Sequence, residues 1–297
     1  MSDVAEIREI VKEQKLKGKA VSFVPTMGAL HAGHISLVDA AKTLKPDTYT
    51  VASIFVNPTQ FGPGEDLDVY PRTLEQDLEM LESAGVDLVF LPTEETMYGD
   101  PNMEIVHVEP SGMDTTREGV ARPQFYRGVA TVVTKLFNIV QPDASFFGQK
   151  DAGQCVLIKS LVRDLCMNIK IVVVPTMREE ADGLAMSSRN AYLNEEERAV
   201  AGIIYQSLSK GKEFYSSRPN RRVGDILAVV EESLRSEPLV RSIEYLSIAS
   251  PHSMEELEDI EKIGENGAVL STALKLGGVR LIDNVLLGGA ESWTRVN

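Results

Sequence analysis

Apolar and polar positions change their period along this chain of 297 residues, and the change predicts two kinds of architecture. Between residues 1 and 175, short apolar or β-branched runs alternate with segments whose apolar residues recur every three or four positions. The runs predict strands at 19–24, 50–56, 86–91, 144–147 and 169–174. The segments between them predict helices at 35–44, 72–84, 129–140 and 151–165. Such alternation favours a parallel sheet with helical crossovers, in which ligands bind at the carboxyl ends of the strands.

The pattern is different after Pro175. A polar loop is followed by helical spacing at 195–215 and 223–234, and then by runs typical of strands at 243–248, 268–276 and 279–283. Helices followed by neighbouring strands are typical of an α+β domain. We therefore predict an α/β protein, with a Rossmann-like parallel sheet in residues 1–177 and a smaller α+β domain in residues 178–297.

The junction between the first strand and the helix after it is the most informative segment. The apolar run ends at Pro25 and Gly28, and His31 and His34 follow where the next helix begins. A helix N-terminus after a buried strand can hold a nucleotide phosphate, because its N–H groups point at the anion. Histidines three positions apart lie on the same side of a helix. From the residues alone, the pair could bind a phosphate, cap the helix or supply half of a metal site.

Composition narrows the choice of ligand and location. The net charge of −14 argues against a nucleic-acid partner, because nucleic-acid backbones recruit clustered Lys and Arg, but a few cations can still serve one ATP. Cys155 and Cys166 predict reduced thiols, and with His107 and His252 isolated they form no zinc pattern. Residues 1–19 carry no apolar signal segment, and no run approaches about 18 apolar residues. A soluble cytoplasmic protein without a membrane partner is expected.

Several motifs resemble those of a known family and occur in the same order. Residues 25–34, Pro-Thr-Met-Gly-Ala-Leu-His-Ala-Gly-His, are similar to the His-x-Gly-His signature of nucleotidylyltransferases in the form found in the pantothenate synthetase (pantoate:β-alanine ligase) family. The resemblance continues through segments 53–61, 127–133, 147–151, 182–190 and 280–284, and so covers nearly the whole chain. It implies condensation of pantoate with β-alanine through a pantoyl adenylate, with ATP consumed and AMP and pyrophosphate released.

The resemblance also implies roles for individual residues. It makes His34 the proton donor of adenylate formation, and it places His31, Lys150 and Arg189 on the phosphates, where fixed donors and positive charge oppose the growing negative charge. Gln60 and Gln154 would contact pantoate, and Gln60 would also meet β-alanine. The full set of implied ATP contacts is Met27, Gly28, His31, Gly33, His34, Gly148, Gln149, Lys150, Asp151, Met177, Met186, Ser187, Ser188 and Arg189. Mg²⁺ would accompany the triphosphate without a recognisable protein motif, and a homodimer is implied as well.

The chain departs from the family pattern in three places. Residues 150–154 read Lys-Asp-Ala-Gly-Gln where Lys-Asp-Tyr-Gln-Gln is usual. Segment 122–128 lacks the usual histidine, and segment 178–183 is one residue longer than the common form. Ser187 and Arg189 follow a matched segment and are carried over more directly than the adenine contact near Met177.

Other interpretations remain for the separate motifs and for the chain. Lys150 and Asp151 could be a solvated ion pair that opens a helix, and Ser187 could simply cap one. Another nucleotidylyltransferase or a class I aminoacyl-tRNA synthetase shares the His-x-Gly-His logic, although an acidic chain without a long basic extension disfavours tRNA. A nucleotide-binding module without catalysis is the third alternative, and such a module has no reason to keep His34 together with both glutamines.

Overall fold

The structure is a computed structural model of the chain, and it describes residues 1–100, 106–217, 222–258, 263–264 and 266–294. These residues fold into two compact units. Unit 1 takes the described residues of 1–114, 122–148 and 157–174, and unit 2 takes those of 115–121, 149–156 and 175–297. The chain therefore leaves unit 1 twice for a short segment before it enters unit 2 at Pro175. A single division after residue 177 stays a prediction.

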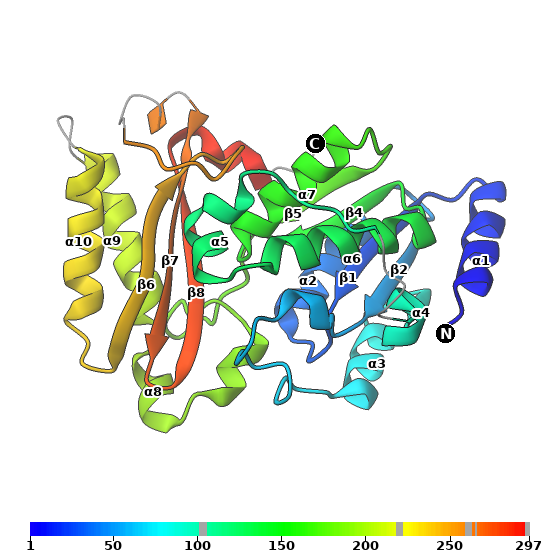
Figure 1. Cartoon of the computed structure of the whole chain (residues 1–297), viewed down its shortest axis with the longest axis horizontal. Coiled ribbons are helices and arrows are strands. Elements are labelled where there is room, and N and C mark those ends of the chain that lie inside the picture. The colour runs from blue at the N-terminus through cyan, green and yellow to red at the C-terminus, as the bar shows by residue number, and fades with distance from the viewer. Residues whose placement is uncertain (101–105, 218–221, 259–262, 265, 295–297) are drawn as a thin grey trace. The chain divides into compact units, whose positions relative to one another are not determined.

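Unit 1 is built on a five-stranded parallel sheet (Figure 1). Its strands are β1 (Val21–Thr26), β2 (Tyr49–Ile54), β3 (Leu88–Phe90), β4 (Ala144–Gly148) and β5 (Lys170–Val174), in the order β3-β2-β1-β4-β5. β1 and β4 pair directly although a long stretch of chain separates them, so the strand order reverses between them. In open α/β sheets, ligands bind at the carboxyl ends of the strands beside such a reversal.

Helices cover both faces of this sheet. They are α1 (Val4–Leu16), α2 (Ala32–Lys42), α3 (Leu74–Ser83), α4 (Glu94–Tyr98), α6 (Phe125–Val140) and α7 (Ala152–Asp164), of which α7 begins in unit 2 and ends in unit 1. On β1, Val24 joins a buried cluster with Leu37 and Val38 of α2. The neighbouring Phe23 meets Phe137 of α6 edge to face, with ring centroids 6.5 Å apart. Since alternate strand residues face opposite ways, the continuous apolar run of β1 is explained by burial on both sides.

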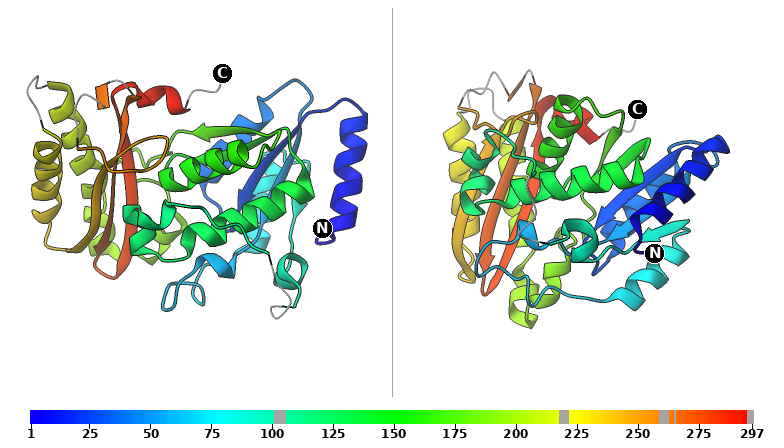
Figure 2. Two further views of the ribbon diagram at one scale, coloured as in Figure 1. Left: turned by 45° about the horizontal axis from the view of Figure 1, so that its top comes forward. Right: turned by 45° about the vertical axis from the view of Figure 1, so that its right-hand side comes forward.

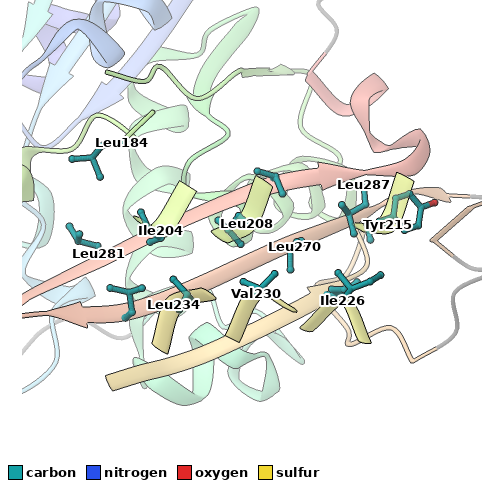
Figure 3. Close-up of a cluster of buried hydrophobic side chains, with 14 of the residues drawn as sticks. Leu184, Ile204, Leu208, Tyr215, Ile226, Val230, Leu234, Leu270, Leu281 and Leu287 are labelled. Atoms are coloured by element: carbon teal, nitrogen blue, oxygen red, sulfur yellow. The ribbon is translucent and has the colours of Figure 1, made fainter. Parts of the chain in front are cut away.

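Unit 2 contains a three-stranded antiparallel sheet in the order β6-β7-β8. Its elements are α5 (Arg117–Ala121), α8 (Glu195–Val200), α9 (Ile203–Ser217), α10 (Val223–Arg235), β6 (Val240–Ala249), β7 (Ala268–Leu276) and β8 (Val279–Leu287). Figure 2 shows α9 and α10, in yellow-green and yellow, on one face of this sheet. Leu208 of α9, Val230 of α10 and Leu270 of β7 belong to the buried cluster that joins them (Figure 3).

The two faces of β8 have different neighbours. Leu281 belongs to the cluster with α9 and α10. Leu286 packs with Ala152 at the start of α7, and Arg280 forms an ion pair of 2.7 Å with Glu118 of α5. Odd-numbered positions of β8 therefore face the two long helices, and even-numbered positions face the short segments 115–121 and 149–156, which also belong to unit 2.

The predicted fold class, an α/β unit with a smaller α+β unit, is confirmed, but the single helix predicted at 195–215 is wrong. The chain forms α8 and α9 instead, with a break at Ala201 and Gly202. A Cβ on Gly202 would lie 2.8 Å from the Cβ of Asp182, so the loop that carries Asp182 packs directly against the break. Tertiary packing thus ends a helix that the apolar spacing continues. Within the described part of the chain, no helix is long and apolar enough to cross a membrane.

Candidate active site

His31 and His34 lie at the start of α2, directly after the turn that follows β1. His31 is the N-cap residue, with extended φ and ψ of −145° and 175°, and its Nδ1 accepts a hydrogen bond from the N–H of Gly33 at 3.1 Å. Nδ1 of His34 accepts from the N–H of His31 at 3.3 Å. The centroids of the two rings are 4.1 Å apart. The capping interpretation of this pair is therefore confirmed.

These caps determine which ring nitrogen carries the hydrogen in a neutral imidazole. A neutral histidine has one N–H, and its other ring nitrogen is an acceptor. Because Nδ1 of His31 and Nδ1 of His34 both accept backbone hydrogen bonds, the neutral rings carry their hydrogens on Nε2. Capping and donation are thus compatible, since Nδ1 serves the helix while Nε2–H is of the kind that stabilises charge on a phosphate oxygen.

Asp77 of α3 holds the turn that leads into α2. Its carboxylate accepts from the N–H groups of Ala29 at 2.9 Å and Leu30 at 2.8 Å, and from the hydroxyl of Thr73 at 3.1 Å. Ala29 has a φ of 50°, a left-handed conformation that costs energy for a residue with a Cβ. Sequence reasoning did not single out Asp77. The pattern that could have identified it is an acidic residue on the buried side of a predicted helix, because Asp77 lies four positions before the buried Leu81 of α3.

Gln60 and Met27, two predicted site residues, are in contact. Gln60 ends a short 3-10 turn, η1 (Pro58–Gln60), and its amide nitrogen lies 3.0 Å from the Sδ of Met27. Its amide oxygen accepts from the side chain of Asn57 at 3.0 Å. Asn57 is 1% exposed, and its own oxygen accepts from the hydroxyl of Tyr98 at 2.6 Å. Asn57 and Tyr98 thus set the orientation of the Gln60 amide, although sequence reasoning assigned them no role.

Helix α6 fixes the position of the η1 turn. A Cβ on Gly128 would lie 2.4 Å from the carbonyl oxygen of Thr59 and 2.7 Å from the Cα of Gln60. The side chain of Asn57 also donates to the carbonyl oxygen of Gly128 at 3.3 Å. The backbone of α6 therefore touches the turn directly, which only glycine permits at this position.

The segment that lacks the usual histidine supports the same turn. Arg122 donates to the carbonyl oxygen of Gln60 at 3.2 Å and forms an ion pair of 2.6 Å with Glu65. Its guanidinium lies over the ring of Phe125, 4.0 Å from the centroid, and Phe125 occupies the position of the missing histidine. This departure therefore replaces a polar ring with an apolar one that packs beneath Arg122.

The predicted residues around Lys150 belong to unit 2, except for Gly148, which ends β4 in unit 1. The ammonium of Lys150 lies 3.7 Å from the carboxylate of Asp151, and the Lys150 side chain is only 18% exposed. Gln154 is half-buried in the first turn of α7. The Lys150 side chain is thus largely buried, which differs from the alternative interpretation of Lys150 and Asp151 as a solvated ion pair.

Asn284 of β8 holds the backbone on either side of Lys150. Its side-chain nitrogen donates to the carbonyl oxygens of Gln149 at 2.9 Å and Lys150 at 3.0 Å. Its side-chain oxygen accepts from the amide of Gln149 at 3.1 Å. Both hydrogens and the oxygen of one buried amide are therefore used to fix two consecutive residues.

The neighbouring Asp283 forms a buried ion pair with Arg178. The guanidinium donates to the two carboxylate oxygens at 2.7 and 2.9 Å, and it also lies 3.8 Å from the ring centroid of Tyr205. Burial raises the pKa of Asp283, while Arg178, the N–H of Asn284 and the charge of Lys150 act in the opposite direction. The two-pronged geometry keeps Arg178 in one orientation.

The loop from Met177 to Arg189 is closed at its base. The N–H of Met186 donates to the carbonyl oxygen of Met177 at 3.0 Å, and Arg178 donates to the carbonyl oxygen of Gly183 at 3.0 Å. Ser187 caps a short 3-10 helix, η4 (Ser188–Tyr192), with its hydroxyl accepting from the N–H of Arg189 at 3.3 Å. The segment with the extra residue is therefore an ordered hairpin, and the capping interpretation of Ser187 is confirmed.

The predicted site residues fall into two groups. Unit 1 brings His31, Gly33 and His34 together, and it places Met27 against Gln60. Unit 2 holds the 149–154 segment and the 177–189 loop on neighbouring residues of β8. Cys155, which is buried, and Cys166, which is exposed, form no disulfide bond with each other. Within the ranges that the structure describes, no group of three His, Cys, Asp or Glu side chains is arranged to hold a metal ion.

Known proteins resemble this chain over nearly its full length. The model of the family described as pantoate-beta-alanine ligase matches residues 1–286. The pantothenate synthetase of Chloroflexus aggregans is 52% identical over 268 residues, which are 90% of this chain and 93% of that protein. The pantothenate synthetase of Herpetosiphon aurantiacus is 47% identical over 287 residues, which are 97% of this chain and 100% of that protein.

Solved structures agree with these relatives. Pantothenate synthetase from Thermus thermophilus superposes with a TM-score of 0.86 at 43% identity, over 96% of this chain and 98% of that one. Pantoate-beta-alanine ligase from Francisella tularensis, solved in complex with β-γ ATP and β-alanine, gives a TM-score of 0.76 at 33% identity, over 96% of each chain.

Proposed function

This chain belongs to the pantoate-β-alanine ligase family, and from that membership we propose how its residues carry out the ATP-dependent condensation of pantoate with β-alanine. Joining a carboxylate to an amine in water is unfavourable, so the acid is activated first. A carboxylate oxygen of pantoate attacks the α-phosphorus of ATP, and pyrophosphate leaves. The amine of β-alanine then attacks the acyl carbon of the pantoyl adenylate, which gives pantothenate and releases AMP.

The observation that carries the assignment of residues is the pair of histidine caps at the start of α2. Because backbone N–H groups occupy both Nδ1 atoms, a neutral His31 or His34 carries its hydrogen on Nε2, and we assign these Nε2–H groups as donors to the nucleotide. Negative charge grows on the phosphoryl and bridging oxygens during the first step, and fixed donors lower the barrier where that charge develops. We assign His34 as the proton donor to the departing pyrophosphate and His31 as a hydrogen-bond donor to a phosphate oxygen.

Lys150 and Arg189 supply the positive charge for the same step. Lys150 is a compact point charge held by a fixed backbone, and Arg189 offers a planar fork that binds two phosphate oxygens at once. The remaining contacts with ATP are assigned by family resemblance to Met27, Gly28, Gly33, Gly148, Gln149, Asp151, Met177, Met186, Ser187 and Ser188.

Gln60 and Gln154 are assigned to pantoate, and Gln60 also to β-alanine. An amide can donate to the carboxylate and accept from the hydroxyls of pantoate without adding a charge. Asn57 supports this role for Gln60, because its contact with the Gln60 oxygen fixes which end of the amide donates.

Mg²⁺ would be held mainly by the triphosphate and by water. Mg²⁺ keeps several waters and is commonly bound through substrate phosphates and one or two carboxylates, and the described residues include no metal-ligand cluster that would replace them. When bound, the ion would neutralise phosphate charge. A homodimer and a cytoplasmic location stay predictions.

The assignment is tested by measuring which ligand each variant loses. Gln60→Ala and Gln154→Ala should weaken pantoate binding about 10-fold or more and leave ATP binding within about 2-fold, because a lost polar contact in a binding site costs on the order of 1–3 kcal/mol. Lys150→Ala should weaken ATP binding and slow adenylate formation. Gln206→Ala on the exposed face of α9 is the matched control and should change neither.

Isothermal titration of each variant with pantoate and with a non-hydrolysable ATP analogue separates these outcomes. The reverse pattern, in which the glutamine variants lose ATP and Lys150→Ala loses pantoate, would sink the assignment. Normal ligand binding by wild-type protein without turnover of any acid would favour a binding module.

A further inference from the structure

Asp283 and Asn284, next to each other on β8, each contact a different segment that the proposed function places on ATP. Side chains alternate between the faces of a strand, so consecutive residues point in opposite directions. Asp283 shares the face of Leu281, on the side of α9, where Arg178 and Tyr205 lie. Asn284 lies on the other face and reaches the residues before α7. One short stretch of strand therefore reaches both segments.

The contacts of Asn284 fix the position of the Lys150 Cα, from which the side chain extends. The two carbonyl oxygens that accept from Asn284 belong to the peptide groups before and after the Cα of Lys150. Asn284 is 1% exposed, so removal of its amide would leave the two carbonyl oxygens without a hydrogen bond that water could readily replace. The Gln149 side chain binds the same amide and closes the arrangement. The Lys150 backbone is thus fixed by a residue 134 positions away in sequence.

The contacts of Asp283 determine the base of the 177–189 loop. The carboxylate accepts from both terminal nitrogens of the Arg178 guanidinium, and one of these nitrogens also donates to the carbonyl oxygen of Gly183. The other donates to the backbone carbonyl oxygen of Asn284 at 3.1 Å. The base of the loop and the anchor of Lys150 therefore share one backbone segment.

We propose that Asp283 and Asn284 are positioning residues that set Lys150 and residues 186–189 of the 177–189 loop relative to each other for adenylate formation. The inference rests on the proposed function, because it requires Lys150 and Arg189 to act on ATP. It adds a role for segment 280–284. No residue of this segment is assigned to ATP, pantoate or β-alanine. Small displacements of a charge from the position where it opposes phosphate charge slow such a step strongly.

The test for Asn284 is a double-mutant cycle on the single-turnover rate of pantoyl adenylate formation. Asn284→Ala should lower the rate about 10-fold or more in the wild-type background, and less than about 3-fold further in Lys150→Ala, because the anchor acts through Lys150. Ser207→Ala is the matched control. It removes a buried hydrogen bond of unit 2, from Ser207 to Ser233 at 2.9 Å, without touching either segment, and should leave the rate unchanged.

Amide hydrogen exchange at residues 150–155 gives a readout that does not depend on turnover. Exchange there should be faster in Asn284→Ala than in Ser207→Ala. If Asn284→Ala does not fold, Asn284→Asp takes its place, since it keeps the size and the acceptor but loses both donors. An undiminished effect of Asn284→Ala in the Lys150→Ala background, or unchanged exchange, would overturn the inference while the proposed function stands. A normal rate for Lys150→Ala would instead overturn the assignment of Lys150.

A second double-mutant cycle, on Arg178 and Arg189, tests Asp283 through its ion-pair partner Arg178. Arg178→Lys keeps the charge but loses the two-pronged contact, so it should slow adenylate formation about 10-fold and should add little to Arg189→Ala. Full additivity of Arg178→Lys and Arg189→Ala would show that Arg178 does not act through the loop, and would remove Asp283 from the proposal.

Discussion

At the scale of single residues, each site histidine accepts a backbone hydrogen bond through Nδ1, and the proposed function gives its Nε2–H a second role as a donor to the nucleotide. Nδ1 of His34 accepts a hydrogen bond from the N–H of His31, and Nδ1 of His31 accepts one from the N–H of Gly33, so the backbone at the start of α2 orients both rings. An alanine at either position removes a cap and a donor together. Amide side chains separate the two roles. The oxygen of asparagine lies near the position of Nδ1 and can keep the cap, and the nitrogen of glutamine lies near the position of Nε2 and can keep the donor.

His34→Asn should keep the cap and lose the donor. We expect its melting temperature to stay close to that of the wild type, and its single-turnover rate of pantoyl adenylate formation to fall about 10²-fold or more, the range for a lost donor to developing charge. His34→Gln should recover part of the rate. A His34→Asn variant with a near-normal rate would remove His34 from the chemistry and leave it as a cap alone.

Sequence reasoning gave no role to Asp77, Asn57 and Asn284, and the physical reason is similar for all three. Asp77 and Asn284 bind backbone groups of other segments, and Asn57 binds a side chain three positions away on a turn. Backbone groups are the same at every residue, so their partners have no pattern in the sequence. Family motifs point to the histidines, Lys150 and Gln60 as candidate site residues, whereas the residues that hold them in place become visible only when the chain is folded.

At the scale of elements, the site depends on a helix that passes very close to a turn. The backbone of α6 lies against η1 at Gly128, and the turn presents Gln60. Strands and long helices could be predicted, because burial on one or both faces leaves a period in the apolar positions. The break between α8 and α9 could not, since it depends on the loop of Asp182, a contact between segments that no local period encodes.

Gly128→Ala should displace the η1 turn. The new Cβ would lie 2.4 Å from a backbone oxygen, so either the helix or the turn moves. We expect the KM for pantoate to rise about 10-fold, with ATP binding changed much less, and the free energy of unfolding to fall by about 1–3 kcal/mol, as for overpacking.

Gly224→Ala is the control for Gly128→Ala. It places the same methyl group in α10, where nothing lies within 4 Å, and it should leave activity unchanged and stability the same or up to about 1 kcal/mol higher. Steady-state kinetics and denaturant unfolding of both variants provide the comparison. Equal, small effects of the two substitutions would contradict a role for the contact between α6 and η1.

At the scale of the whole molecule, the residues assigned to one reaction come from both units. His31, His34 and Gln60 belong to unit 1, whereas Lys150 and Arg189 belong to unit 2. An acidic chain with a net charge of −14 can still act on ATP, because the charge that matters is that of the few groups near the phosphates. The assigned roles of these residues require one order of events, in which pantoate is activated before β-alanine reacts.

Rapid-quench measurement of pyrophosphate tests that order most directly. With ATP, Mg²⁺ and pantoate but no β-alanine, the wild-type protein should release about one equivalent of pyrophosphate per active site, because the adenylate stays bound and protected from water. Addition of β-alanine should convert this burst into turnover that yields AMP and pantothenate. Formation of ADP and phosphate, or release of pyrophosphate only after β-alanine is added, would contradict activation of pantoate as an adenylate.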